Sequence, residues 1–521
     1  MKNREIEAAW NYHNGTKHSY QSVRAGRHYL DWENQPMPFK IYSNLELIAL
    51  PQHLSSSGMP TLEVISIPSA RGDQPKTLAS QDLAEILFLS AGITRRRSYA
   101  GGEILFRAAA CTGALYHIDL YLVCGELEGL EEGVYQFSPQ DFALRRLRAG
   151  DYRSVLANAS GGESSIAHAP CMIVSASTFW RNAWKYQARA YRHCYWDNGT
   201  MLANLLAAAV ARGIPAKLNV GFVDTAVSVL LDLDEHREAP LSIVALGGGS
   251  PQAASAPPVE FLKLETMPLS KSEVDYPEMR AMHLASSLEN QAEVVAWRES
   301  PIKAGGERVK DDGKTGNRIF PLRSLNDEEI PKDSIENVIT RRGSTREFAR
   351  EAITMTQIST MLDRSTNGVL TDFLGQEEEL LNDLYLIVHA VEGLPAGAYV
   401  YRWQKRGLEL LKEGDFRRDA GYLGLGQAIP ADCSVNIYFL ADLHRALERF
   451  GNRGYRAAQL EAAIMGGKIY LAAYAQRLGA SGLTFFDDDV TEFFSPDAAG
   501  KSVMFLVAVG KSANRKTPSV G

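Results

Sequence analysis

Cysteine is scarce in this chain, and no cysteine pattern typical of a metal site is present. Five cysteines occur in 521 residues, at positions 111, 124, 171, 194 and 433, and no two form a Cys-x-x-Cys pair. An odd, scattered set argues against a disulfide framework and a thiolate zinc site. No HExxH motif is present either, so we expect no metal. This cysteine usage favours a reducing compartment, and we expect a cytoplasmic protein.

Excess positive charge and long apolar runs are also missing. The net charge is −7 and the isoelectric point is about 6.0, so we expect no nucleic-acid partner. The longest apolar stretch, residues 201–210, is interrupted by Asn204 and is shorter than the about 20 residues that cross a bilayer. The first 20 residues lack the apolar core of a signal peptide. We therefore expect a soluble protein with no membrane contact.

The chain is long enough for two domains and contains an internal repeat. Its 521 residues exceed what one hydrophobic core usually holds. The stretch LYLVCGELEGLEEGVYQF, from Leu120, matches LYLIVHAVEGLPAGAYVY, from Leu384, 264 residues later. Two further blocks keep nearly the same spacing: ARAYR matches NRGYR, and IVALG matches LVAVG. Three blocks in one order indicate that a whole domain was duplicated.

Each copy predicts an α+β domain. Two β-rich runs precede an Ala- and Leu-rich helix, near residues 191–212 and 455–477, whose composition suits burial in a helical interface. Each copy ends in a nearly continuous apolar run, which predicts a central strand buried on both faces.

The domain limits follow from the repeat. We expect an extension over 1–50, copy one over 51–250, a polar connector over 251–334 and copy two over 335–521. Within the connector, we expect a helix in 265–300 and loop or disorder in 303–318.

An Arg-rich motif, TRRGSTREF, opens copy two at residues 340–348. Guanidinium groups beside a hydroxyl and free backbone N–H groups suit an anion such as phosphate, although a solvated basic loop has the same composition. The pattern resembles the FMN-binding motif of the nitroreductase superfamily. The resemblance implies that Arg342, Ser344 and Arg346 hold the ribityl-phosphate and pyrimidine edge of FMN. Gly343 stands where a bulkier residue is sometimes found, which leaves its role open.

A small-residue segment of copy one, RAAACTGALYHIDLYLV, begins at Arg107. It resembles the Pro-Ser-Ala-Gly-Ala-Leu-Tyr-Pro segment of the azoline-oxidase-like (SagB/ThcOx-type) branch of that superfamily. The resemblance implies that Cys111, Thr112 and Gly113 lie against the flavin, because small residues let the backbone approach a flat ring. Taken alone, the segment also fits a simple turn before a strand.

A Lys-Tyr pair lies further along copy one, in WKYQARAYRH. Lys185 and Tyr186 resemble a pair implicated in catalysis in azoline oxidases. A lysine beside a tyrosine can lower one pKa and supply a proton acceptor next to a flavin. The alternative is two amphipathic side chains at the surface.

Two further segments of copy two resemble flavin contacts of the superfamily. The turn GASGLTFFDDDV resembles the Gly-rich turn against the flavin ring, which implies that the N–H groups of Gly482 and Leu483 lie near flavin N5 and O4. The tail VGKSANRK places Lys511 and Arg515 where basic residues often close on the FMN phosphate. The alternatives are a helix C-cap before a strand and a frayed basic tail.

These motifs are divided unequally between the copies. Copy one has only Arg71 opposite the Arg-rich motif, and copy two has Arg449–Phe450 opposite the Lys-Tyr pair. Nitroreductases are usually homodimers with FMN sites at the subunit interface. The resemblance therefore implies two tandem FMN-dependent domains that form an intramolecular pseudo-dimer with one complete flavin site and one degenerate site. Such a chain can act as a monomer or assemble into a higher homo-oligomer.

The leading hypothesis is an oxidoreductase, specifically an FMN-dependent dehydrogenase of the azoline-oxidase type. It would act on a small molecule or peptide, with Lys185 or Tyr186 as base. The segment 9–42 also resembles that branch. Two alternatives stay open: an NAD(P)H-dependent nitro or quinone reductase, and a non-catalytic partner protein with degenerate flavin sites.

Overall fold

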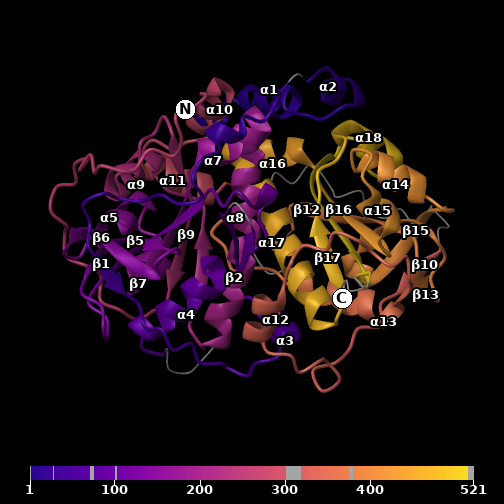
Figure 1. Cartoon of the computed structure of the whole chain (residues 1–521), viewed down its shortest axis with the longest axis horizontal. Helices are drawn as coiled ribbons and strands as arrows, with labels where there is room; N and C mark the ends of the chain where they lie inside the picture. The colour runs from indigo at the N-terminus through magenta and orange to yellow at the C-terminus, as the bar shows by residue number, and fades with distance from the viewer. Residues whose placement is uncertain are drawn as a thin grey trace.

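Two seven-stranded antiparallel sheets form the centres of the two halves of the molecule (Figure 1). The computed structural model describes residues 2–26, 28–70, 76–99, 102–300, 318–374 and 380–513. The first sheet runs in the order β1 (Leu47–Ala49), β6 (Ala143–Ala149), β5 (Gly133–Ser138), β4 (Ile118–Cys124), β7 (Cys171–Thr178), β9 (Glu238–Leu246), β8 (Ala216–Asn219). The second runs in the order β10 (Ile319–Pro321), β15 (Gly407–Glu413), β14 (Gly397–Arg402), β12 (Asn382–Val388), β16 (Val435–Ala441), β18 (Ser502–Gly510), β17 (Gly479–Gly482).

Helices and one small two-stranded sheet complete each half. The helices of the first half and the connector are α1 (Glu7–Gly15), α2 (Tyr20–Ala25), α3 (Thr61–Val64), α4 (Ser80–Ala91), α5 (Arg153–Ala159), α6 (Ser164–Ala167), α7 (Phe179–Tyr186), α8 (Ala190–Ala211), α9 (Asp224–Leu231), α10 (Pro277–Ala285) and α11 (Gln291–Arg298). Those of the second half are α12 (Ile335–Arg341), α13 (Met355–Thr366), α14 (Arg417–Leu423), α15 (Ala428–Asp432), α16 (Leu443–Phe450), α17 (Arg453–Ala475) and α18 (Asp487–Phe494). Strands β2 (Ile93–Tyr99) and β3 (Gly102–Arg107) form a hairpin, and β11 (Ile353–Thr354) pairs with β13 (Val391–Glu392).

The predicted α+β fold in two tandem copies is confirmed. The two sheets have the same strand order, α8 and α17 match the two expected long helices, and β9 and β18 are buried at every residue. Each sheet also takes an edge strand, β1 or β10, from outside the ranges expected for the domains. The connector has two helices where one was expected, because Asn290 caps a new helix by accepting a hydrogen bond from the Glu293 N–H. Segment 303–318 lies outside the described residues except for Arg318.

Helices α8 and α17 pack side by side between the two halves (Figure 1). A Cβ added to Gly199 would lie 2.5 Å from Cβ of Ala463, and one added to Gly467 would lie 2.6 Å from Cβ of Ala203. Within each contact the partners are 264 residues apart, which is the spacing of the repeat. The helices therefore run parallel about a pseudo-twofold axis, and glycine lets their backbones approach closely.

One buried ion cluster joins the halves at the start of α9. Asp224 accepts hydrogen bonds of 2.6 Å from Arg453 and 2.6 Å from Arg456, both on α17. Burial alone would raise the pKa of Asp224, but the two guanidinium groups outweigh it and lower the pKa to about 2. Arg456 also donates hydrogen bonds to the Ser286 hydroxyl, next to α10, and to the His283 carbonyl, within α10. The connector therefore covers an interdomain contact.

A second cluster is the pseudo-symmetric counterpart of the first. Asp487, the first residue of α18, accepts hydrogen bonds of 2.9 Å from Arg189 and 2.6 Å from Arg192. The His18 N–H donates to Asp487, and the Thr16 hydroxyl accepts from Arg192. The N-terminal segment therefore covers this cluster. The repeated blocks ARAYR and NRGYR supply all four arginines. Each half therefore gives an aspartate to the arginines of the other.

The first prediction concerns the Asp224 cluster. Asp224→Asn leaves two buried guanidinium groups without a carboxylate, so the free energy of unfolding should fall by about 3–5 kcal/mol. The pKa of Asp224 is lower in the folded state than in the unfolded chain. Its contribution is therefore complete above about pH 4 and is lost as the pH falls towards 2.

Chemical denaturation at pH 7 and at pH 3 measures both effects. Asp275→Asn is the matched control, because Asp275 pairs with Arg280 at the surface, and its change should stay below about 1 kcal/mol. Equal losses in the two variants would contradict the role given to the cluster.

Candidate functional site

The Arg-rich motif lies at the contact between the halves. It follows α12, and the Arg342 guanidinium donates to the carbonyls of Ala108 (3.0 Å) and Arg107 (3.3 Å) in the first half. Burial lowers the pKa of Arg342. A motif that was predicted for one copy is therefore held against the backbone of the other.

The other two predicted ligands of the motif line the same contact. The Ser344 hydroxyl lies 3.4 Å from the hydroxyl of Tyr470 on α17. Arg346 is exposed, and its guanidinium has no hydrogen bond or ion pair to any residue that the structure describes. The Ser344 hydroxyl thus lies beside Tyr470, and the Arg346 guanidinium is exposed.

Asp197 on α8 anchors the Cys-Thr-Gly segment of copy one. Its carboxylate accepts hydrogen bonds from the Thr112 N–H (2.8 Å), the Thr112 hydroxyl (2.7 Å) and the Cys111 thiol (3.1 Å). Burial raises the pKa of Cys111, and the adjacent carboxylate raises it further. His117 Nε2 lies 2.9 Å from the same carboxylate. The side chains of Cys111 and Thr112 therefore hold the loop in place, while Gly113 is exposed.

Gly113 and Tyr186 meet next to this loop. Gly113 has a φ of +64°, and a Cβ there would lie 2.8 Å from the Tyr186 hydroxyl. The Tyr186 ring contacts His193 edge-on, and Lys185 Nζ lies 5.4 Å from the centre of that ring. Only glycine leaves room for the phenol in this position. The predicted pair and the predicted small-residue segment are thus brought together.

The sequence allows for a lowered pKa of Tyr186, whereas the folded structure raises this pKa. Burial raises the pKa of Tyr186, the charges of Asp197 and Cys111 add to this effect, and Arg346 of copy two opposes it. The phenol is therefore protonated at neutral pH and can donate a proton. Its electrostatic coupling to Arg346 also shows that the two copies face each other here.

The turn after β17 uses the two predicted N–H groups within the protein. The Gly482 N–H donates to the Tyr470 hydroxyl, and the Leu483 N–H donates to the Leu506 carbonyl at 3.1 Å. Neither N–H is free, because the first binds a side chain of α17 and the second binds the backbone of β18. The next residue is different: the N–H of Thr484 finds no acceptor among the described residues, and its hydroxyl is buried without a partner there. The sequence predicts Gly482 and Leu483 as flavin contacts but not Thr484, the residue that follows them.

The C-terminal segment supports the Arg-rich motif through its backbone. The Lys511 carbonyl accepts from the Ala349 N–H at 2.9 Å, whereas Lys511 Nζ pairs with Glu351 at the surface. The Ser512 hydroxyl lies 3.4 Å from that of Thr345. Arg515, also predicted as a ligand, lies outside the described residues.

The pseudo-equivalent turn in copy one, after β8, is closed. The N–H groups of Val220 and Gly221 donate to the Asp372 carboxylate at 2.9 Å and 2.8 Å. By position in the repeat, they correspond to the N–H groups of Leu483 and Thr484. Burial raises the pKa of Asp372, and the two N–H groups oppose that change. A carboxylate from copy two therefore occupies both donors in copy one, whereas in copy two only the Thr484 N–H has no acceptor among the described residues.

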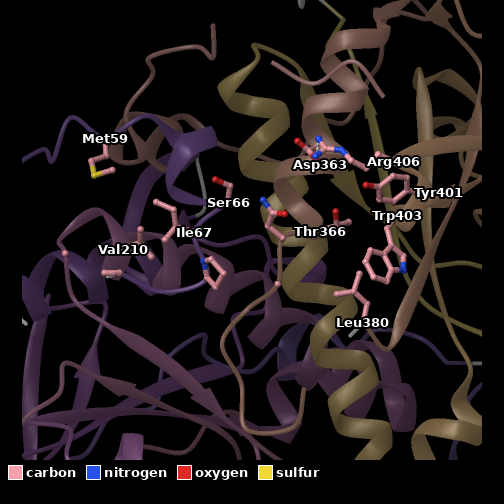
Figure 2. Close-up of a pocket in the computed structure, with 15 residues that line it drawn as sticks. Met59, Ser66, Ile67, Val210, Asp363, Thr366, Leu380, Tyr401, Trp403 and Arg406 are labelled. Atoms are coloured by element: carbon pink, nitrogen blue, oxygen red, sulfur yellow. Dashed lines mark hydrogen bonds and ion pairs between the residues drawn. The ribbon is translucent and has the colours of Figure 1, made fainter. Parts of the chain in front are cut away.

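A cavity of about 840 Å³ lies between the halves and contains none of the predicted flavin ligands. Its lining residues come from both halves (Figure 2) and include Met59, Ile67, Pro68, Val210, Tyr401 and Trp403. Pro68 belongs to the counterpart of the Arg-rich motif in copy one. In the described part of the chain, no group of His, Cys, Asp and Glu is arranged to hold a metal ion. None of the described helices is long and apolar enough to cross a membrane.

Comparison of the sequence and the structure with known proteins shows which of them this chain resembles. Residues 339–511 match the model of the nitroreductase family. MJ1384 of Methanocaldococcus jannaschii, assigned as a nitroreductase, is 26% identical over 170 residues, which are 33% of this chain and 81% of the relative. A crystal structure of a protein assigned as a nitroreductase from Anabaena variabilis matches with a TM-score of 0.76 at 24% identity. It covers 97% of this chain and 99% of its own, which shows the fold of both halves.

Two peptide-processing proteins are also similar to part of the chain. The microcin B17-processing protein McbC of Escherichia coli is 29% identical over 141 residues, which are 26% of this chain and 52% of McbC. The trifolitoxin-processing protein TfxB of Rhizobium leguminosarum bv. trifolii is 29% identical over 149 residues, which are 28% of this chain and 40% of TfxB. The chain thus spans about half or less of the length of these two relatives.

The second prediction concerns Thr484. Thr484→Val removes a buried hydroxyl that has no described partner, so the free energy of unfolding of the cofactor-free protein should stay constant or rise by about 1 kcal/mol. Thr491→Val is the control, because that hydroxyl donates to the Lys501 carbonyl, and its loss should cost about 1 kcal/mol. Thermal unfolding of both variants measures these changes in stability. A loss in Thr484→Val as large as in the control would mean that its hydroxyl is already satisfied.

Proposed function

Because this chain belongs to the nitroreductase superfamily and to its SagB-like branch, we propose that it is an FMN-dependent oxidoreductase with one composite flavin site. One observation carries this proposal. In copy two, the buried hydroxyl and the N–H of Thr484 have no partner among the described residues, and the exposed Arg346 acts electrostatically on Tyr186 of copy one. A buried polar group without a protein partner takes its partner from solvent or from a ligand, and we propose that bound flavin supplies the partner of Thr484.

The residues present fit the two ends of FMN. Arg342 and Ser344 supply cationic and hydroxyl donors suited to a phosphate. Arg346, Thr484 and the exposed backbone at Gly113 suit the polar edge and the flat face of the ring. Copy two supplies the phosphate donors and the polar groups for the ring edge, and copy one supplies the backbone for the flat face, so the proposed site needs both copies.

Bound FMN would supply the ability to accept a hydride from a substrate carbon. Lys185 is the proposed base that takes the accompanying proton, and together these transfers remove two hydrogens from the substrate. Tyr186 is protonated, so its proposed role is to donate a hydrogen bond to the substrate or the ring. Asp197 is proposed to position Lys185 and Tyr186, because it fixes the loop whose Gly113 packs against Tyr186.

The corresponding position in copy one is proposed to be inactive. Asp372 already accepts from the two N–H groups of its turn, and Pro68 stands in the counterpart of the Arg-rich motif. The Asp372 carboxylate would also repel an electron-rich flavin edge. One flavin site per chain follows from this reading.

The proposed reaction is the oxidation of an azoline ring in a peptide to an azole. Its support is the similarity to McbC and TfxB, whose names describe the processing of microcin B17 and trifolitoxin. A second candidate is an NAD(P)H-dependent nitro or quinone reductase, which is favoured by the similarity to 81% of MJ1384. Rapid bleaching of the flavin by NADPH would select the second.

The third prediction tests the base. Lys185→Ala should keep bound FMN, because no flavin contact is proposed for the lysine, and should lower the rate of oxidation of an azoline-containing model peptide by about 100-fold or more. Lys332→Ala is the control, since Lys332 lies in an exposed loop and donates to the Asp327 carbonyl. Flavin absorbance and turnover are measured on the same preparations. Unchanged turnover in Lys185→Ala would refute the assignment of the base.

A further inference from the structure

The β2–β3 hairpin distinguishes copy one from copy two. In copy one it lies between α4 and β4, whereas the described residues between α13 and β12 in copy two form no such hairpin. The hairpin is held against the Arg-rich motif, because Arg342 donates to the carbonyls of Arg107 and Ala108 at its end. An element found in one copy thus lies beside the flavin motif of the other.

Arg95 of this hairpin points at the Arg-rich motif. Its guanidinium stacks on Phe106, with 4.5 Å from Cζ to the ring centre. One Arg95 Nη lies 3.9 Å from the place that a Cβ on Gly343 would take. Apart from the chain neighbours of Gly343, the Tyr474 hydroxyl, also at 3.9 Å, is the other atom of the described residues within 4 Å of that place. Gly343, whose role the sequence leaves open, therefore keeps a small space between Arg95 and Tyr474.

Two positively charged groups, those of Arg95 and Arg342, lie next to this space. Burial lowers the pKa of Arg342, and the positive charge of Arg95 acts in the same direction, so the two guanidinium groups repel each other. Neither has an ion pair with a carboxylate among the described residues, since Arg342 donates to backbone carbonyls and Arg95 stacks on Phe106. Converging guanidinium groups without a carboxylate are stabilised by an anion that both can bind.

We propose that Arg95 is a phosphate ligand, supplied by copy one to the anion site of the Arg-rich motif in copy two. The site takes a phosphate monoester, with Arg342 and Ser344 on one side and Arg95 on the other. In the cofactor this is the phosphate of FMN, and in that respect the inference rests on the proposed function. The hairpin then explains in part why only one of the two pseudo-equivalent positions binds flavin.

The test compares FMN with riboflavin, which has the same ring and ribityl chain but no phosphate. Dissociation constants are measured by flavin fluorescence quenching for wild type, Arg95→Ala and Arg96→Ala. Arg96 is the matched control, because it removes the same charge from the next residue of the strand, where it pairs with Glu103 at the surface. Arg95 is exposed, so its replacement leaves the core intact, and far-UV circular dichroism verifies this.

Arg95→Ala should weaken FMN binding by about tenfold, which is about 1.4 kcal/mol, and change riboflavin binding by less than about twofold. Arg96→Ala should leave both unchanged. Equal weakening of FMN and riboflavin, or no change in FMN, would overturn the assignment of Arg95. A wild type that binds neither flavin would instead refute the proposed function. In that case, binding of inorganic phosphate that depends on Arg95 would still support the anion site.

Discussion

The parallel packing of α8 against α17 is the constraint on which the rest of the molecule depends. Gly199 and Gly467 bring the two backbones close enough for the sheets to become pseudo-symmetric partners. On either side of this contact, Asp224 and Asp487 each hold two buried arginines of the opposite half. Removing one carboxylate leaves buried charge uncompensated, so the halves are held in one arrangement rather than linked loosely. The proposed site needs that precision, because its parts come from both halves.

The pseudo-twofold symmetry creates two equivalent positions for a flavin, and these positions differ in the residues that surround them. In one, the Thr484 hydroxyl and the Arg346 guanidinium have no partner within the part of the chain that the structure describes, and Gly113 leaves room for Tyr186. In the other, Asp372 fills the donors of the turn. A pair of identical subunits cannot divide its residues in this way, since every change would appear twice. Tandem duplication removes that restriction, and each copy has kept the features that its partner lacks.

Much of this arrangement can be predicted from the sequence, because the signals are local. The repeat spacing gives the two halves, the apolar composition gives α8 and α17, and the Arg-rich motif gives Arg342 beside the interface. Asp197, Asp372 and Arg95 could not be found in this way, because each acts on residues far away in the chain. Nothing in the residues around Asp372 indicates that its carboxylate meets the N–H groups of Val220 and Gly221. The raised pKa of Tyr186 likewise results from its burial in the folded chain.

The central claim is that the two halves build a single flavin site. It is tested most directly by saturating the purified chain with FMN, removing the free flavin, and counting the flavin that is released on denaturation against the protein concentration. The account predicts about one FMN per chain, with loss of that flavin in Arg342→Ala. Two FMN per chain would contradict the closure of the copy-one position by Asp372, and no bound FMN would contradict the composite site itself.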